Sequence, residues 1–147
     1  MELWELSARE RIRDSLARYN WSGDAMRLSE LAESFCEDGE LEVRGAVPVR
    51  GRGAIVEFLS GAVASPRAIA EAASVKRIVR HNVTNIRFTE LTPEQARVSC
   101  YFAVFTEVGL DHYGRYRDLF VPVGEEWLIR HRFVSTDWHA PNSTMAG

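Results

Sequence analysis

The first part of the chain repeats hydrophobic residues at the spacing of an α-helix. The apolar positions are Ile12, Leu16 and Tyr19. Residues three or four apart share one face of a helix, so this pattern predicts an amphipathic helix over residues 8–20. Ser7 and Glu10 have the spacing of a capping box, in which the serine caps the helix and the glutamate reaches back to its start.

Two further helices are expected before residue 63. Asp24 follows a Ser-Gly break and is a favourable N-cap for a second helix, which ends near residues 37–39. Its apolar face consists of Leu28, Leu31, Ala32 and Phe35. The elements expected next are an alternating strand over 40–44, a glycine-rich turn over 45–53 and a third helix over 54–62. Residues 63–78 show only weak periodicity, and we leave open whether they form a helix or a flap.

From His81 onward the hydrophobic pattern changes to a period of two. It predicts strands over 79–89, 96–108, 113–123 and 127–137. Short connections between consecutive strands favour an antiparallel meander. Helices followed by a sheet indicate an α+β fold. We expect one domain over 1–147, with a core over about 8–138 and a small, polar, frayed tail over 140–147.

Composition excludes several classes of protein. The net charge of −3 argues against a nucleic-acid partner, which requires a basic surface. No apolar run approaches the roughly 20 residues needed to span a membrane, and the N-terminus does not resemble a secretion signal, so a cytoplasmic location is expected. Cys36 and Cys100 are expected as buried reduced thiols. The four histidines show no ligand spacing, so no metal site is expected.

Five segments occur in a characteristic order along the chain. They are Arg18-Tyr19-Asn20 with Ser22-Gly23-Asp24, then Phe35-Cys36-Glu37-Asp38-Gly39, Gly51-Arg52-Gly53-Ala54-Ile55, Arg80-His81-Asn82-Val83-Thr84-Asn85, and Gly114-Arg115-Tyr116-Arg117-Asp118 followed by Trp127 and Arg132. In this order they resemble the SnoaL-like family of the nuclear-transport-factor-2-like (NTF2-like) superfamily. The resemblance implies a cone-shaped fold, in which N-terminal helices close one end of a curved sheet around a small-molecule pocket.

The superfamily that the chain resembles is mixed in function. It includes polyketide cyclases, dehydratase-like lyases, ketosteroid isomerases, and the non-catalytic small subunits of ring-hydroxylating dioxygenases. The resemblance therefore implies a pocket more firmly than a particular reaction.

His81 is the leading catalytic candidate. It matches the histidine that dehydratase-like relatives use as a general base, a task that suits an ordinary histidine pKa near 6.5. The other interpretation is a histidine at a strand end, hydrogen-bonded to a loop. In those relatives an aspartate after the first helix orients the imidazole, and Trp21 occupies the matching position here. Asp24, three residues later, is either a helix cap or the missing acid.

Asp118 is the second catalytic candidate. It shares a strand face with Tyr116 and Phe120, where an unpaired buried carboxylate would be costly. It therefore either forms an ion pair with Arg130 or Arg132 on the next strand, or enters the pocket beside His81.

Four aromatic residues are candidate ligand contacts. They are Tyr19, Trp21, Tyr101 and Tyr116. Each has an alternative role in packing of the helix or the sheet.

Two functions remain open from the sequence. The first is an enzyme of the lyase, isomerase or cyclase type that needs no cofactor, because neither a nucleotide-binding nor a metal-binding motif occurs. In this hypothesis His81 removes a proton next to a carbonyl of a cyclic substrate, and tyrosine hydroxyls stabilise the enolate. The alternative is a non-catalytic binding protein or a partner subunit like those of the dioxygenases. Under either hypothesis we expect a homodimer formed by the outer face of the sheet.

Overall fold

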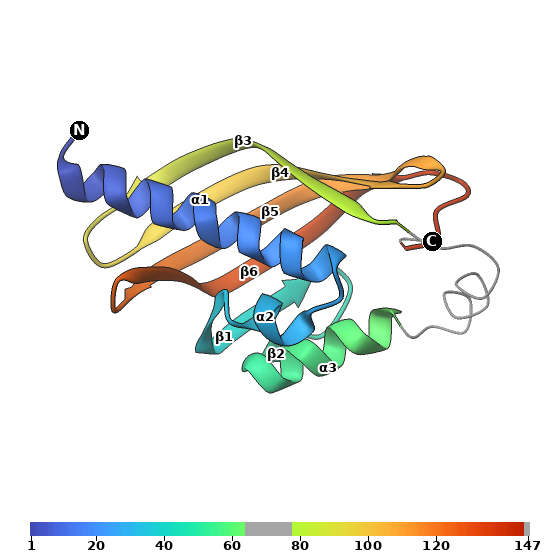
Figure 1. The fold of residues 1–147 in the computed structure, drawn as a ribbon, viewed down its shortest axis with the longest axis horizontal. Coiled ribbons are helices and arrows are strands. Elements are labelled where there is room, and N and C mark those ends of the chain that lie inside the picture. Colours follow the sequence, from blue (N-terminus) through green and yellow to red (C-terminus); the bar gives the residue numbers. More distant parts are fainter. Residues whose placement is uncertain (64–77, 146–147) are drawn as a thin grey trace.

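The computed structural model describes residues 1–63 and 78–145, which form three helices and one six-stranded sheet (Figure 1). The helices are α1 (Leu3–Asp24), α2 (Leu28–Ala32) and α3 (Arg52–Val63). The strands are β1 (Phe35–Val43), β2 (Val49–Arg50), β3 (Arg80–Leu91), β4 (Ala96–Thr106), β5 (Gly109–Val123) and β6 (Glu126–His139). The four strands expected after residue 78 are confirmed, with bounds that differ by a few residues. Residues 64–77, most of the segment left open above, lie outside the described residues.

The strands lie in the order β2-β1-β6-β5-β4-β3, and β3 to β6 form the expected antiparallel meander. The sequence did not indicate that β1 pairs in parallel with β6. Register shifts interrupt each of the long strand pairs, and such shifts bend and twist a sheet. Gly114 lies at one shift, where a Cβ atom would be 2.0 Å from the carbonyl oxygen of Ser135. Only glycine permits this close approach of β5 and β6.

Helix α1 lies across one face of the sheet (Figure 1). The predicted apolar stripe is confirmed, because Ile12, Leu16 and Tyr19 are all buried. The start of the helix was predicted wrongly. The capping box is formed by Glu2 and Glu5, so the helix begins at Leu3 rather than at residue 8. Once this first turn is formed, the N–H groups after residue 7 bond within the helix and have no need of a cap.

The second helix also differs from the prediction. Its N-cap residue is Arg27, and it ends at Ala32, so Phe35 belongs to β1 rather than to the helix. Met26 has a φ of 62°, a left-handed conformation that separates the two helices. Asp24 is therefore the last residue of α1 and does not cap α2.

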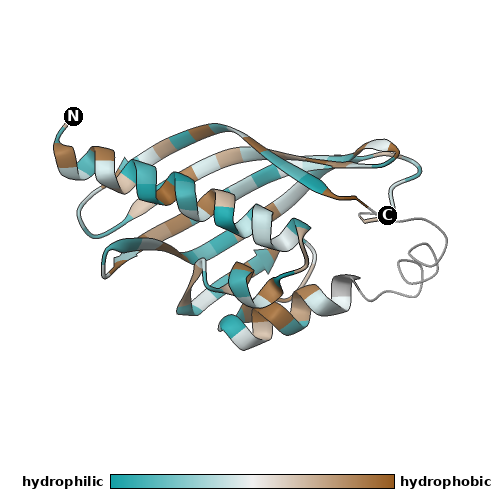
Figure 2. Ribbon diagram, viewed as in Figure 1, coloured by the Kyte–Doolittle hydropathy of each residue, from teal (hydrophilic) through white to brown (hydrophobic). Residues whose placement is uncertain are grey.

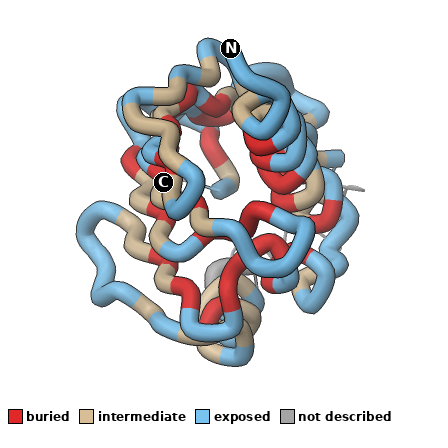
Figure 3. Tube along the Cα trace, turned by 90° about the vertical axis from the view of Figure 1, so that its left-hand side faces the viewer, coloured by how far each residue is buried: buried red, intermediate tan, exposed pale blue. Residues whose placement is uncertain are grey.

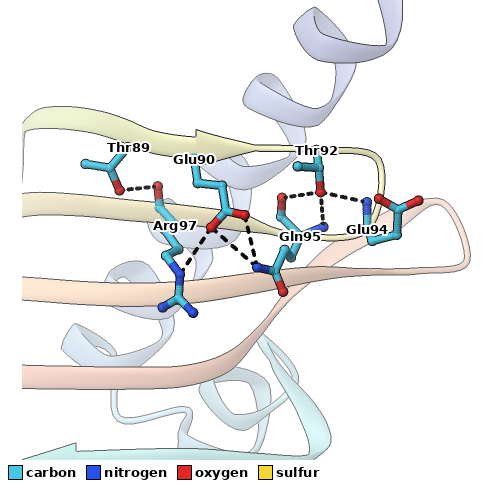
Figure 4. Close-up of polar contacts among 6 residues, drawn as sticks. All are labelled: Thr89, Glu90, Thr92, Glu94, Gln95 and Arg97. Atoms are coloured by element: carbon cyan, nitrogen blue, oxygen red, sulfur yellow. Dashed lines mark hydrogen bonds and ion pairs between the residues drawn. The ribbon is translucent and has the colours of Figure 1, made fainter.

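Side chains at the C-terminal end of β3 and the beginning of β4 hold the turn of the β3–β4 hairpin (Figure 4). The hydroxyl oxygen of Thr92 accepts hydrogen bonds from the backbone N–H groups of Glu94 and Gln95, each at 3.2 Å. The side-chain amide of Gln95 donates to Glu90, which also forms an ion pair with Arg97 at 3.2 Å. These contacts hold the turn between β3 and β4, which contains Pro93, a residue common in turns.

The hydrophobic core lies between α1 and the side of the sheet that faces it (Figure 3). Along the strands, hydrophobic and hydrophilic residues alternate, so the sheet has one buried face and one more exposed face (Figure 2). Cys36 and Cys100 are buried free thiols, as expected. Among the described residues, no helix has both the length and the hydrophobicity required to cross a membrane.

The C-terminal segment is described through residue 145. Three groups of the segment donate hydrogen bonds to Asp111 on β5. The N–H of Ala140 bonds to the Asp111 carbonyl at 2.8 Å, and the Ser143 hydroxyl and Thr144 N–H bond to its carboxylate at 2.8 and 3.1 Å. The buried Asp111 carboxylate requires hydrogen-bond donors, and the C-terminal segment supplies them. The composition of the segment alone did not indicate this contact.

Candidate functional site

A cavity of about 710 Å³ opens between α1 and the first half of β3. Helix α1 contributes Arg13, Leu16, Ala17, Asn20, Trp21 and Asp24 to its wall. These positions recur every three or four residues, so they form one face of the helix. From β3 the wall includes His81, Val83 and Ile86. The wall therefore combines apolar side chains with a small group of polar ones, which is the usual make-up of a small-molecule site.

Asp24 and His81 form the polar centre of this cavity. The carboxylate of Asp24 accepts a hydrogen bond from the His81 backbone N–H at 2.9 Å, and its other oxygen lies 2.5 Å from His81 Nδ1. An ionised carboxylate only accepts hydrogen bonds, so Nδ1 carries the ring proton. The lone pair then resides on Nε2, which bonds to no other residue of the described chain. An imidazole held in this way can accept a proton from a bound molecule.

The position of Asp24 explains how a carboxylate contacts His81 although residue 21 is a tryptophan and not an aspartate. Residues three apart are neighbours on a helix surface, so Trp21 and Asp24 face the same cavity. Trp21 is 75% exposed and contributes to the edge of the cavity without filling it. Of the two roles considered for Asp24, the structure shows the contact with His81 and not the helix cap.

Asp118 does not share the cavity with His81, which corrects the expectation that the two face one pocket. Its carboxylate accepts two hydrogen bonds from Arg132, at 2.8 and 2.9 Å, and neither side chain is exposed. This is the ion pair considered as its structural role. Along β4, Val104 lies opposite His81 and Val98 lies opposite Asp118. Six residues of a strand separate the two levels by about 20 Å.

The four aromatic candidates occupy different environments. Tyr19 and Tyr116 are buried in the core, where the faces of both rings contact the Arg132 guanidinium, at 4.2 and 3.9 Å. Tyr101 is 54% exposed on the opposite face of the sheet from α1. Among the four, only Trp21 lines the described cavity.

Asn20 is a cavity residue that the sequence analysis did not single out. It lies four residues before Asp24, which places the two side chains on one face about 6 Å apart along the helix. Its side-chain oxygen accepts a hydrogen bond from the Tyr116 hydroxyl at 3.3 Å. The spacing from Asp24 was the available signal, but without the partner on β5 it did not distinguish Asn20 from other polar helix residues.

A second carboxylate–imidazole pair lies on β5. The Nδ1 atom of His112 is 2.7 Å from the Asp111 carboxylate. Burial lowers the pKa of His112, although hydrogen bonding to Asp111 opposes this effect. Burial would raise the pKa of Asp111, but hydrogen bonds from His112, Ser143 and the Thr144 N–H outweigh it and hold that pKa below its ordinary value. Both residues lie within β5, which begins at Gly109.

Basic side chains surround the cavity although the whole chain carries a net charge of −3. Arg13, Arg27 and Arg80 contribute to its wall, together with the single carboxylate of Asp24. Arg27 forms an exposed ion pair with Glu30 at 2.9 Å. Over the described part of the chain, no group of three His, Cys, Asp or Glu side chains is arranged to hold a metal ion.

The fold places the protein in a known class. A solved NTF2-like protein with a cystatin-like fold from Novosphingobium aromaticivorans superposes with a TM-score of 0.75 and 24% identity, over 96% of this chain and 89% of that one. The protein therefore has the cone-shaped α+β fold of the NTF2-like class. Within this class the chain belongs to the SnoaL-like domain family, whose model matches residues 4–133.

Two further solved structures share the fold. One is a candidate scytalone dehydratase from Novosphingobium aromaticivorans, with 23% identity and a TM-score of 0.73 over 97% of this chain and 95% of that one. The other is a protein from Catenulispora acidiphila in complex with S-DNPA, with 23% identity and a TM-score of 0.71 over 88% and 92% of the two chains. A comparison with curated proteins finds no match.

Proposed function

We propose that the chain is an enzyme that removes a proton from a carbon next to a carbonyl group of a small, cyclic organic molecule. The observation on which this rests is the Asp24–His81 pair in the wall of a cavity large enough for such a molecule. The likeness in fold to a candidate scytalone dehydratase supports the same class of reaction.

In this mechanism His81 is the general base. Its Nε2 atom takes the proton, and the ring becomes an imidazolium whose charge the adjacent Asp24 carboxylate stabilises. The carboxylate also fixes the ring orientation through the bonds to Nδ1 and to the backbone N–H. Leu16, Val83 and Ile86 provide an apolar surface for the hydrocarbon skeleton.

Deuterium exchange tests the proposal without knowledge of the natural substrate. The purified protein is mixed in D2O with a panel of cyclic ketones, including cyclohexanone and 2-tetralone, and loss of the α-proton signals is followed by NMR. We expect His81→Gln to lower the catalysed exchange rate by about 10²- to 10⁴-fold, the usual contribution of a general base. Asp24→Asn should lower it by at least about 10²-fold, because the amide retains the shape of the carboxylate but not its charge.

His131→Gln is the matched control, because it makes the same substitution outside the cavity. His131 is partly exposed and lies 3.2 Å from Glu42. Exchange at the wild-type rate is expected for this variant. Unchanged exchange in His81→Gln would contradict the assignment of the base. No exchange by the wild type with any ketone of the panel would favour the non-catalytic alternative.

We also infer a homodimer that uses the outer face of the sheet. Large aromatic side chains are exposed there, namely Tyr101, Phe105, Tyr113 and Trp138. The rings of Tyr113 and Trp138 stack at 5.5 Å, so they form a continuous apolar surface across β5 and β6. Exposed apolar surfaces of this kind mark protein contacts.

Light scattering measures the state of association directly. A dimer of the wild type that dissociates in a Tyr101→Arg variant is the expected result, since a charge would be buried in the interface. A monomer at all concentrations contradicts the inference. A stable complex with a larger subunit, in place of a homodimer, would support the partner-subunit alternative.

A further inference from the structure

A connected set of buried polar residues leads from the core to the cavity. Asp118 binds the guanidinium of Arg132, and Arg132 lies over the ring of Tyr116 at 3.9 Å. The hydroxyl of Tyr116 then donates to the side-chain oxygen of Asn20. Asn20 is itself only 7% exposed, yet it forms part of the cavity wall.

The ring of Tyr116 is fixed from both sides, which fixes the direction of its hydroxyl. Arg132 lies on one side, and the ring of Phe102 stacks on it at 4.6 Å. Burial raises the pKa of Tyr116 well above its ordinary value, so the hydroxyl keeps its proton and remains a donor. Asn20 is thus held with its oxygen toward the core.

The amide nitrogen of Asn20 must then point away from Tyr116. This Nδ2 atom donates to no acceptor among the described residues. It is also not one of the fully buried polar atoms without a partner, so part of its surface is accessible. A donor in this position is available to a molecule in the cavity. It lies one helical turn from Asp24, which holds the base His81.

We propose that the amide of Asn20 donates a hydrogen bond to an acceptor oxygen of the substrate, and so selects a carbonyl compound and orients it beside His81. The inference rests on the proposed function and specifies the substrate class. A fixed donor near the base would also stabilise the negative charge that develops on the carbonyl oxygen as the proton leaves. In this arrangement Tyr116 is a positioning residue, because it acts through Asn20.

The first test compares two probes of similar shape, 2-tetralone and tetralin, of which only the ketone has an oxygen. Binding is followed in ¹H–¹⁵N NMR spectra of the His81→Gln variant, which removes the proposed base. The side-chain amide signal of Asn20 is assigned by its loss in Asn20→Leu. We expect 2-tetralone to shift this signal and tetralin to leave it unchanged. Equal shifts with both probes, or no binding of the ketone, would overturn the proposal.

The second test measures dissociation constants of the same probes. Asn20→Leu keeps the size of the side chain but removes the donor, so we expect about 3- to 10-fold weaker binding of 2-tetralone, the usual effect of one hydrogen bond. Tyr116→Phe should also weaken the binding of 2-tetralone, because the Asn20 amide loses the hydrogen bond that orients it. Neither substitution should weaken the binding of tetralin. Equal weakening of both probes would mean that these residues only pack the cavity wall, and would refute the proposal.

The two proposals fail in different ways. If the Asn20 signal responds to the ketone but the wild type catalyses no exchange, the binding role stands and the catalytic proposal fails. If exchange depends on His81 but Asn20→Leu binds and exchanges 2-tetralone as the wild type does, the catalytic proposal stands and the role of Asn20 fails. Thermal unfolding of each variant shows whether it remains folded at the temperature of the assay.

Discussion

The buried ion pair of Asp118 and Arg132 gives the sharpest prediction of stability. Neither side chain is exposed, and two hydrogen bonds of 2.8 and 2.9 Å join them. In Asp118→Asn the guanidinium remains charged, because arginine does not lose its proton in proteins. The variant therefore leaves an uncompensated charge in the core, which costs about 3–5 kcal/mol of unfolding free energy.

The expected change is large enough to measure and small enough to leave the protein folded. At about 0.05–0.15 kcal/mol per residue, a chain of 147 residues has an unfolding free energy of about 7–22 kcal/mol. An unfolding entropy of about 2.1 cal/mol/K per residue gives about 0.3 kcal/mol/K for this chain, so the Tm should fall by about 10–16 °C. Calorimetry and urea unfolding measure the two quantities independently.

Asp137→Asn is the matched control, because Arg115 and Asp137 form a similar two-bonded pair across the same strands at 3.1 Å. Those side chains are 38% and 33% exposed, so water screens the charge and the loss should not exceed about 1 kcal/mol. The double variant Asp118→Leu/Arg132→Met should recover most of the loss, since no charge remains buried. A loss in Asp118→Asn no larger than that in Asp137→Asn would refute this account of the core.

Three further predictions follow from burial. Gly114→Ala should lower the unfolding free energy by about 1–3 kcal/mol or more in urea titrations, because its Cβ would be 2.0 Å from the Ser135 carbonyl oxygen; a neutral effect would contradict the assigned register. Burial raises the pKa of Cys100 to about 12, so at pH 8 its reaction with a thiol reagent should require unfolding, and rapid labelling of the native protein would show that the thiol is accessible. Hydrogen bonds hold the pKa of Asp111 in the folded protein below its pKa in the unfolded chain, which is about 3.9. These bonds therefore stabilise the folded state fully at pH values above about 3.9, and the stabilisation is lost as the pH falls through the lowered pKa of the folded state. Urea titrations should show Asp111→Asn less stable than the wild type at pH 7, with a difference that narrows in acid; a constant difference would contradict this assignment.

Much of the fold could be predicted from local patterns. The strands after residue 78 were predicted from the alternation of hydrophobic and polar residues, because successive side chains of a strand face opposite sides of the sheet. The apolar stripe of α1 was predicted from helical spacing. Local patterns were less informative at the ends of elements, where Glu2 and Ser7 compete as caps and only one of them begins the helix.

The candidate site was predicted only in part. His81 was identified through the resemblance to dehydratase-like relatives, and it does line the cavity. Its partner was not settled, because a short polar side chain such as that of Asp24 satisfies local rules equally well as a helix cap. The choice depends on which strand lies against the end of α1. Asn20 was missed for the same reason, since its role depends on Tyr116, 96 residues away.

The sequence by itself determined the order of the main helices and strands, the apolar face of α1 and the alternation of β3 to β6, and that a histidine lies near the start of the first of these strands. Tertiary structure alone decided that Asp24 joins His81 across 57 residues, that Asp118 joins Arg132 instead of entering the cavity, and that the C-terminal segment binds Asp111. The physical reason is that periodicity reports the direction of a side chain relative to its own element. The partner of a polar group is set by the packing of elements against one another, which brings distant residues within hydrogen-bonding distance and leaves each buried charge one available partner.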